Sequence, residues 1–149
     1  MTASNHVLTG MIIASTVNNP VLALPLALMS HFALDGLPHY SDEKVVYTDF
    51  KFKLILGADA YIAALCLFLV LLLHPVHMWI IIAGGVLAAS PDLMWLPDFI
   101  AALRNQPKPA YGPIRQFHHK VQWWTKPKGA YIEGIWFACA FLIAFTYTI

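Results

Sequence analysis

Charged residues are scarce in this chain. Asp, Glu, Lys and Arg make up 11% of its 149 residues, whereas 59% are hydrophobic. Soluble globular domains carry roughly 25% charged residues, so the composition excludes that class and predicts an integral membrane protein. Nine basic residues nearly balance eight acidic ones and give a net charge of +1. Because nucleic-acid binders need a basic excess to neutralise phosphates, the sequence predicts no nucleic-acid partner.

Cysteine is also scarce, and several common catalytic motifs are missing. The two cysteines, Cys66 and Cys139, lie within apolar runs, which predicts small buried hydrophobes rather than a disulfide or a thiolate metal site. The chain has neither a Gly-rich phosphate loop nor a Ser nucleophile motif. Its first residues, MTASNHVLTG, lack the positively charged region of a signal peptide, so we expect the first helix to be retained.

Long apolar runs predict the fold. A membrane-crossing helix needs roughly 20 apolar residues, and residues 54–73, 78–96 and 130–149 meet that length. Two further helices are expected before them, because Asn18-Asn19-Pro20 interrupts the first third of the chain. The first, about residues 6–17, is too short to cross, and the second covers residues 20–36. The sequence therefore predicts a single-domain, all-α polytopic membrane bundle of about five helices.

The stretch IRQFHHKVQWW, residues 114–124, predicts an additional amphipathic helix at the membrane surface. Its apolar residues recur on one face at helical spacing, and Trp123 and Trp124 suit an interfacial belt. Adjacent histidines on a helix point roughly 100° apart. His118 borders the apolar face and is the preferred ligand that this segment would deliver to a site, with His119 as the alternative.

Counting the predicted crossings places every basic residue on one side of the membrane. The segments 38–53 and 97–129 both fall on the side of the N-terminus, and the C-terminus falls on the other. The positive-inside rule makes the basic side cytoplasmic, and we expect a bacterial or archaeal cytoplasmic membrane with the C-terminus outside. The nine residues are Lys44, Lys51, Lys53, Arg104, Lys108, Arg115, Lys120, Lys126 and Lys128.

Histidines and aspartates gather towards the same side. Those in the predicted spans lie within roughly 10 Å of one membrane face at the helical rise. Ionisable groups at that depth are costly and usually face a cavity or one another. Imidazoles and carboxylates clustered at one level predict a metal site. The residues are His6, His31, Asp35, Asp59, Asp92, His118 and His119.

Residues 30–39, SHFALDGLPH, contain the pair on which the metal hypothesis depends most. His31 and Asp35 are four residues apart, so they project from one helical face and can bind one cation or two adjacent ones. The residue before a proline avoids the helical conformation, so Pro38 ends the helix before His39. His39 would therefore have to fold back, either as a ligand or as a partner of one.

The sequence leaves alternative roles open for two aspartates, Asp92 and Asp59. Pro91 in Ser90-Pro91-Asp92 cannot donate to the Leu87 carbonyl and kinks the helix, which frees backbone oxygens beside Asp92. The alternative is that Pro91 only bends the helix and that Asp92 meets interfacial water. Asp59 lies near the start of its predicted helix. A catalytic role and the satisfaction of N-terminal amides are equally compatible with that position.

The motifs HVLTG at residues 6–10, SHFALDGLPH, SPD and FHHKVQW resemble a family of small integral-membrane, metal-dependent hydrolases distantly related to zinc-dependent phospholipase C. The resemblance covers most of the chain. The SPD and FHHK stretches depart from the more acidic and His-Arg-Gly motifs of many relatives, which leaves the number of ions open. The resemblance implies metal ligands at His6, His31, Asp35, Asp92 and His118 or His119, with His39 as a further candidate.

Histidine and aspartate donors without cysteine favour zinc, as one ion or two, with manganese or iron as alternatives. Such ions activate water for attack on a phosphoryl group, and Asp59 or His39 would handle the proton. A site just beneath the cytoplasmic headgroups predicts a phospholipid or another lipid-linked phosphoester as the substrate.

Two other classes of function would use the same residues. In a metal-ion or proton-coupled transport protein they would form a binding site along a permeation pathway. The segments predicted to lie at the middle of the bilayer are apolar, however, and so small a transporter would need to oligomerise. In a membrane scaffold they would hold a structural metal. The sequence does not separate an active enzyme from a scaffold, and it leaves the oligomeric state open.

Overall fold

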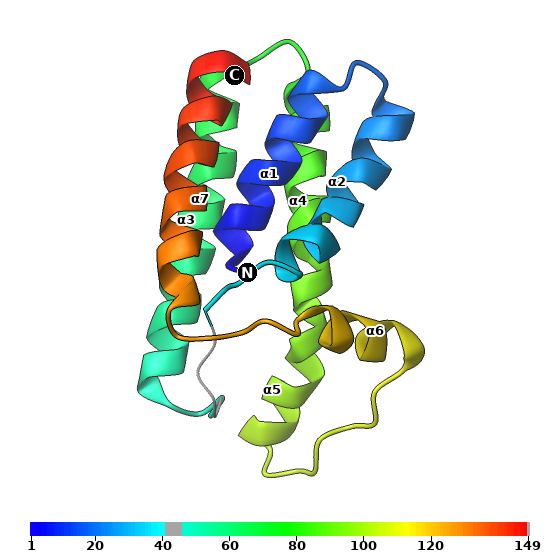
Figure 1. Cartoon of the computed structure of the whole chain (residues 1–149), viewed down its shortest axis with the longest axis vertical. Helices are drawn as coiled ribbons and strands as arrows, with labels where there is room; N and C mark the ends of the chain where they lie inside the picture. Colours follow the sequence, from blue (N-terminus) through cyan, green and yellow to red (C-terminus); the bar gives the residue numbers. More distant parts are fainter. Residues whose placement is uncertain (41–45, 149) are drawn as a thin grey trace.

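The computed structural model describes residues 1–40 and 46–148, so Lys44 and Ile149 of the topology prediction lie outside it. Within the described residues the helices form a bundle (Figure 1), which confirms the predicted all-α class. The elements are α1 (Ala3–Thr16), α2 (Pro20–Asp35), α3 (Phe50–Leu73), α4 (Met78–Ala89), the 3-10 helix η1 (Ser90–Trp95), α5 (Leu96–Leu103), α6 (Pro113–Val121), α7 (Gly129–Ile143) and the π-helix η2 (Ala144–Thr148).

Three helical segments of the described chain are long and apolar enough to cross a membrane. They are Phe50–Leu73, Met78–Leu103, which joins α4, η1 and α5, and Gly129–Thr146. Large hydrophobic side chains such as Phe68 and Leu72 are exposed on the surface of this bundle. Contiguous apolar surface of this kind is unfavourable in water and favourable in lipid. The architecture is consistent with a membrane protein.

The second of these segments is longer than the sequence predicted. We expected the helix to end at Leu96 and a surface loop to begin at Pro97, but α5 continues to Leu103. Proline is tolerated in the first turn of a helix, because its missing N–H would have no intrahelical acceptor there. Pro97 occupies that position in α5, so it continues the helical path after η1 instead of ending it.

The short helix α1 lies in the middle of the bundle and packs against α2, α3, α4 and α7 (Figure 1). Its contact with α4 is close because a glycine stands on each side. A β-carbon added at Gly84 would lie 2.7 Å from the carbonyl oxygen of Gly10, and one added at Gly10 would collide with the Gly84 backbone. Both helices therefore approach at a distance that only glycine permits.

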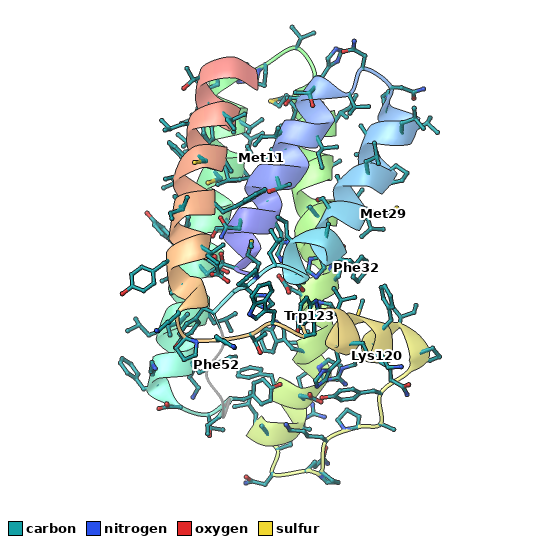
Figure 2. All side chains as sticks on the ribbon, in the orientation of Figure 1. Met11, Met29, Phe32, Phe52, Lys120 and Trp123 are labelled. Carbon is teal, nitrogen blue, oxygen red and sulfur yellow. The ribbon has the colours of Figure 1, made fainter. Side chains whose placement is uncertain are left out.

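One end of the bundle collects the polar residues. The start of α1, the end of α2, η1 and α6 meet there, and α6 runs across the bundle axis (Figure 1). Figure 2 shows Lys120 and Trp123 at this end, whereas Met11 lies further along the bundle. The core around Met11 is apolar, with buried Leu8, Val70 and Ile81. The fold thus separates a polar end from an apolar interior.

Candidate metal centre

Four side chains at the polar end form a group that can hold a metal ion. Each of His6, His31, Asp35 and Asp92 offers one donor atom, and these atoms all lie within 4.8 Å of one another. His6 comes from α1, His31 and Asp35 from the last turns of α2, and Asp92 from η1. His6, His31 and Asp35 are completely buried. Three chain segments therefore converge on one small volume.

The Asp35 carboxylate is the centre of this group. Its Oδ1 lies 3.1 Å from His6 Nε2, and its Oδ2 lies 3.2 Å from His31 Nε2 and 2.9 Å from His118 Nε2. The Met1 amino group also contacts Oδ1. Donors at roughly 2.0–2.1 Å from a tetrahedral zinc ion are separated from each other by about 3.4 Å. The donor spacing around Asp35 is close to what one shared cation requires.

A backbone carbonyl orients the His31 ring. His31 Nδ1 lies 2.9 Å from the Ala88 oxygen, and because a carbonyl only accepts, Nδ1 carries the proton and Nε2 presents its lone pair to the group. Metal-binding histidines characteristically donate their second ring N–H in this way. The partner of Ala88 in a 3-10 pattern would be residue 91, which is proline and has no N–H. Pro91 thus leaves this carbonyl available to His31.

His6 is held differently. Its ring stacks on that of His31 with centroids 4.0 Å apart, and its Nε2 faces Asp35. Its Nδ1 is buried and has no hydrogen-bond partner among the described residues. The His6 tautomer is therefore not fixed by a second partner, in contrast to that of His31.

Asp92 forms the looser side of the group. Its carboxylate oxygens lie 3.8 Å from His6 Nε2 and 3.9 Å from His31 Nε2, and its side chain is 22% exposed. The other three donors have side chains with no exposed surface. Asp92 is therefore the one of these four donors whose side chain reaches the surface.

Helix α6 brings His118, and not His119, to the group. His118 is buried, with Nε2 2.9 Å from His31 Nε2, whereas His119 is exposed beside the Tyr111 ring. One turn after His118, the Gln122 side chain donates to Asp35 Oδ2 at 2.9 Å. We did not predict Gln122 from the sequence, although its spacing of four residues from His118 places both on one helical face.

The two predicted proton-transfer residues lie elsewhere. Asp59 accepts hydrogen bonds from the backbone N–H groups of Ala3 at 2.7 Å and Ser4 at 3.0 Å. This satisfies amides at the start of α1, which begins three residues before the predicted start at His6. These amides belong to α1 and not to the helix that carries Asp59, because α3 begins at Phe50 and places Asp59 well inside the helix. The expectation that Asp59 lies near the start of its own helix is therefore wrong, and its role in proton transfer stays a prediction.

His39 folds back after Pro38 and is buried. Its backbone pairs with the segment after α6 through an isolated bridge to Thr125, and its Nδ1 donates to the Leu37 carbonyl at 2.8 Å. Burial lowers the pKa of His39. His39 is not one of the four donors of the group.

A buried ion pair that the sequence did not reveal anchors α6. Asp98 of α5 is 1% exposed and pairs with Arg115, which lies one turn before His118. The Tyr111 hydroxyl donates to Asp98 at 3.1 Å, and the Arg115 guanidinium lies 3.9 Å from the Tyr111 ring centre. Because Asp98 is in a stretch that we expected to be a loop, no spacing rule linked it to Arg115.

We expect Arg115→Gln to weaken metal binding without removing a ligand. Loss of the pair with Asp98 frees α6 and lets His118 leave the group, and outer partners of metal ligands typically contribute about 10–100-fold in affinity. Zinc affinity is measured by competition with a chelating dye. Arg104→Gln, which removes an exposed arginine at the end of α5, is the control. Equal affinities for Arg115→Gln and the wild type would show that Arg115 does not position His118.

The donor set of imidazole nitrogens and carboxylate oxygens suits a divalent metal ion. The orientation of His31 and the donor spacing around Asp35 fit such an ion, and Asp92 leaves one side accessible. Comparisons of the chain with protein-family models, with curated proteins and with solved structures find no match.

Proposed function

We propose that this chain is a membrane-embedded, metal-dependent hydrolase that acts on a phospholipid or another lipid-linked phosphoester. The observation that carries the proposal is the His6, His31, Asp35 and Asp92 group at one end of a membrane bundle, closed on the sides of three donors and accessible at Asp92. These four residues are among the positions at which the resemblance to small membrane hydrolases implies metal ligands.

The residues of the site have different roles in the proposed reaction. His6, His31, Asp35 and Asp92 would hold one or two zinc ions, with manganese or iron as alternatives and His118 as a further ligand. The bound metal would supply Lewis acidity towards water and a phosphoryl oxygen. His39, whose Nδ1 is committed to the Leu37 carbonyl, keeps Nε2 available to accept a proton. Gln122 holds the Asp35 carboxylate in place.

The position of the group favours a lipid substrate. Exposed Trp123 and Trp124 follow α6 at the polar end (Figure 2 labels Trp123), and tryptophans prefer the boundary between headgroups and hydrocarbon. Lys120 adds positive charge beside them, which attracts phosphate groups. We propose that this end faces the cytoplasm of a bacterial or archaeal cell, with the C-terminus outside.

The apolar core of the helical bundle favours a hydrolase over a transport protein. A conduit for ions would continue from the metal group through the bundle, but the buried residues beyond it include Leu8, Met11, Val70 and Ile81. Ions do not cross such an apolar core without polar partners.

We expect His39→Gln to lower turnover by about 100-fold, the range of a general base, while the metal content stays at the wild-type level. The assay follows headgroup or phosphate release from a panel of lipid phosphoesters in nanodiscs, with metal content measured on the same samples. Chelation of the metal should abolish turnover, and His119→Gln, at the exposed neighbour of His118, should change neither quantity. Metal binding without turnover on any lipid would overturn the hydrolase proposal and leave a scaffold or a transport protein.

A further inference from the structure

The first turns of α7 pack against the residues that follow α2. Gly129, the first residue of α7, stands directly against the main chain of His39. A β-carbon at Gly129 would lie 2.6 Å from the His39 α-carbon and would collide with the His39 carbonyl group. The two main chains therefore approach at a distance that only glycine permits, and a larger residue at position 129 would displace His39.

Glu133 lies one turn after Gly129 on the same face of α7. Its Oε1 accepts a hydrogen bond from the main-chain N–H of Tyr40 at 3.2 Å. Glu133 is only 7% exposed, and a buried carboxylate in an apolar helix is costly unless it has a hydrogen-bond partner. The Tyr40 N–H is such a partner. Two consecutive residues, His39 and Tyr40, therefore each meet one residue of α7.

The main chain of His39 is also bonded to the segment that follows α6. The His39 N–H donates to the Trp124 carbonyl at 3.3 Å, and the Lys126 N–H donates to the His39 carbonyl at 3.0 Å. In the ring, Nδ1 donates to the Leu37 carbonyl at 2.8 Å. Both main-chain polar groups and one ring nitrogen of His39 are therefore committed, and Nε2 is the ring nitrogen that remains for chemistry.

Short connections link these contacts to the metal group. His39 is four residues after Asp35 along the chain. Trp124, which accepts from His39, is two residues after Gln122, and the Gln122 side chain donates to the Asp35 carboxylate at 2.9 Å. His39 is thus linked to the same carboxylate by two routes. A contact that sets the position of His39 therefore also sets where its Nε2 lies relative to that carboxylate.

We propose that Gly129 and Glu133 are positioning residues for His39. Gly129 sets how closely the His39 main chain approaches α7, and Glu133 fixes the next residue through the Tyr40 N–H. Neither residue is among the four donors of the metal group, so both act through His39. Their effect on turnover rests on the proposed function, in which His39 Nε2 accepts a proton. The position of the main chain at residues 39–40 can be measured without turnover.

The first test compares turnover of lipid phosphoesters in two backgrounds. Glu133→Gln keeps a carbonyl oxygen that can accept the Tyr40 N–H, whereas Glu133→Leu removes the acceptor. Because misplacement of a catalytic group by about 1 Å can cost about 100-fold in rate, we expect kcat to fall about tenfold in Glu133→Leu, with KM and metal content unchanged. Glu133→Gln should restore kcat. In a His39→Gln background, Glu133→Leu should cause no further loss, and a second tenfold decrease there would overturn the proposal.

Two glycine variants complete the comparison. Gly129→Ala leaves Glu133 intact and displaces His39 by a single methyl group, so it should also lower kcat about tenfold. Gly134→Leu is the matched control, because it places a leucine beside Glu133 at an exposed position where a β-carbon meets nothing within 4 Å. It should turn over like the wild type. Equal kcat values for Gly129→Ala and the wild type would show that the approach of α7 does not set the position of His39.

The second test follows the Tyr40 amide and needs no substrate. The dipeptide His-Tyr occurs once in the chain, so labelling histidine carbonyls with ¹³C and tyrosine with ¹⁵N gives one NMR cross-peak, that of Tyr40. We expect this N–H to exchange with deuterated water about tenfold faster in Glu133→Leu, and at the wild-type rate in Gly134→Leu. An unchanged rate in Glu133→Leu would overturn the proposal. A wild-type protein that hydrolyses no lipid phosphoester would refute the proposed function, and the exchange rate would still decide whether Glu133 positions this segment.

Discussion

Asp35→Ala is expected to purify almost free of metal. The Asp35 carboxylate is within 3.2 Å of ring nitrogens of His6, His31 and His118, so its loss removes both a ligand and the negative charge that balances a cation among three imidazoles. Removing only an outer partner of a ligand costs about 10–100-fold in affinity, so removing this ligand is expected to cost more than about 100-fold. Metal content after loading and affinity by chelator competition measure the effect.

The control for Asp35→Ala is Asp49→Ala. Asp49 is an exposed carboxylate that precedes α3 and makes no side-chain cap, so its removal changes the net charge equally without reaching the group. Size-exclusion profiles and thermal melting confirm that both variants fold. If Asp35→Ala and the wild type take up the same amount of zinc under metal-replete conditions, the metal centre is not where the structure places it.

The second large effect is expected at the contact between α1 and α4. Gly84→Leu forces a side chain into a space where even a β-carbon would be 2.7 Å from the Gly10 carbonyl oxygen. Overpacking of this kind costs about 3 kcal/mol at the upper end of its usual range, which corresponds to a decrease in Tm of about 10 °C for a chain of this size. Thermal melting of the detergent-solubilised protein measures it.

Metal binding should fall together with stability in Gly84→Leu. His6 is one turn before Gly10 on α1, so displacing α1 from α4 moves His6 away from His31 and Asp35. Gly57→Leu, at an open position on α3, should melt like the wild type and bind metal normally. A Gly84→Leu variant with unchanged Tm would show that the two helices can separate without cost.

Local sequence patterns predicted the parts of the site that depend on one helix at a time. The spacing of His31 and Asp35 placed both on one face of α2, and Pro38 ended the helix before His39, as the structure has it. Pro91 was expected to free the Leu87 carbonyl, but that oxygen accepts from the Ser90 hydroxyl at 2.8 Å, and the carbonyl that accepts from His31 is that of Ala88. The features that were predicted follow from helix periodicity and from the restriction that proline places on the residue before it, which need no knowledge of the tertiary fold.

Contacts between distant segments could not be predicted in the same way. Asp98 and Arg115 belong to different helices, and a pairing across the fold leaves no periodic signal in either. The extension of α1 back to Ala3 depends on a carboxylate supplied by α3. His118, which the sequence favours over His119 because it borders the apolar face, is the histidine that α6 brings to the group, but the ion pair between Arg115 and Asp98 that anchors this helix left no such signal.

The bond between His31 and the Ala88 carbonyl has a consequence for how the site can change by mutation. The acceptor is part of the main chain, so no replacement of the side chain at position 88 can delete it. Position 91 is different, because any residue other than proline brings an N–H that competes for the same oxygen. Which ring nitrogen of His31 carries the proton therefore depends on the residue at position 91. A substitution of Pro91 can alter the metal group without replacing any of its ligands.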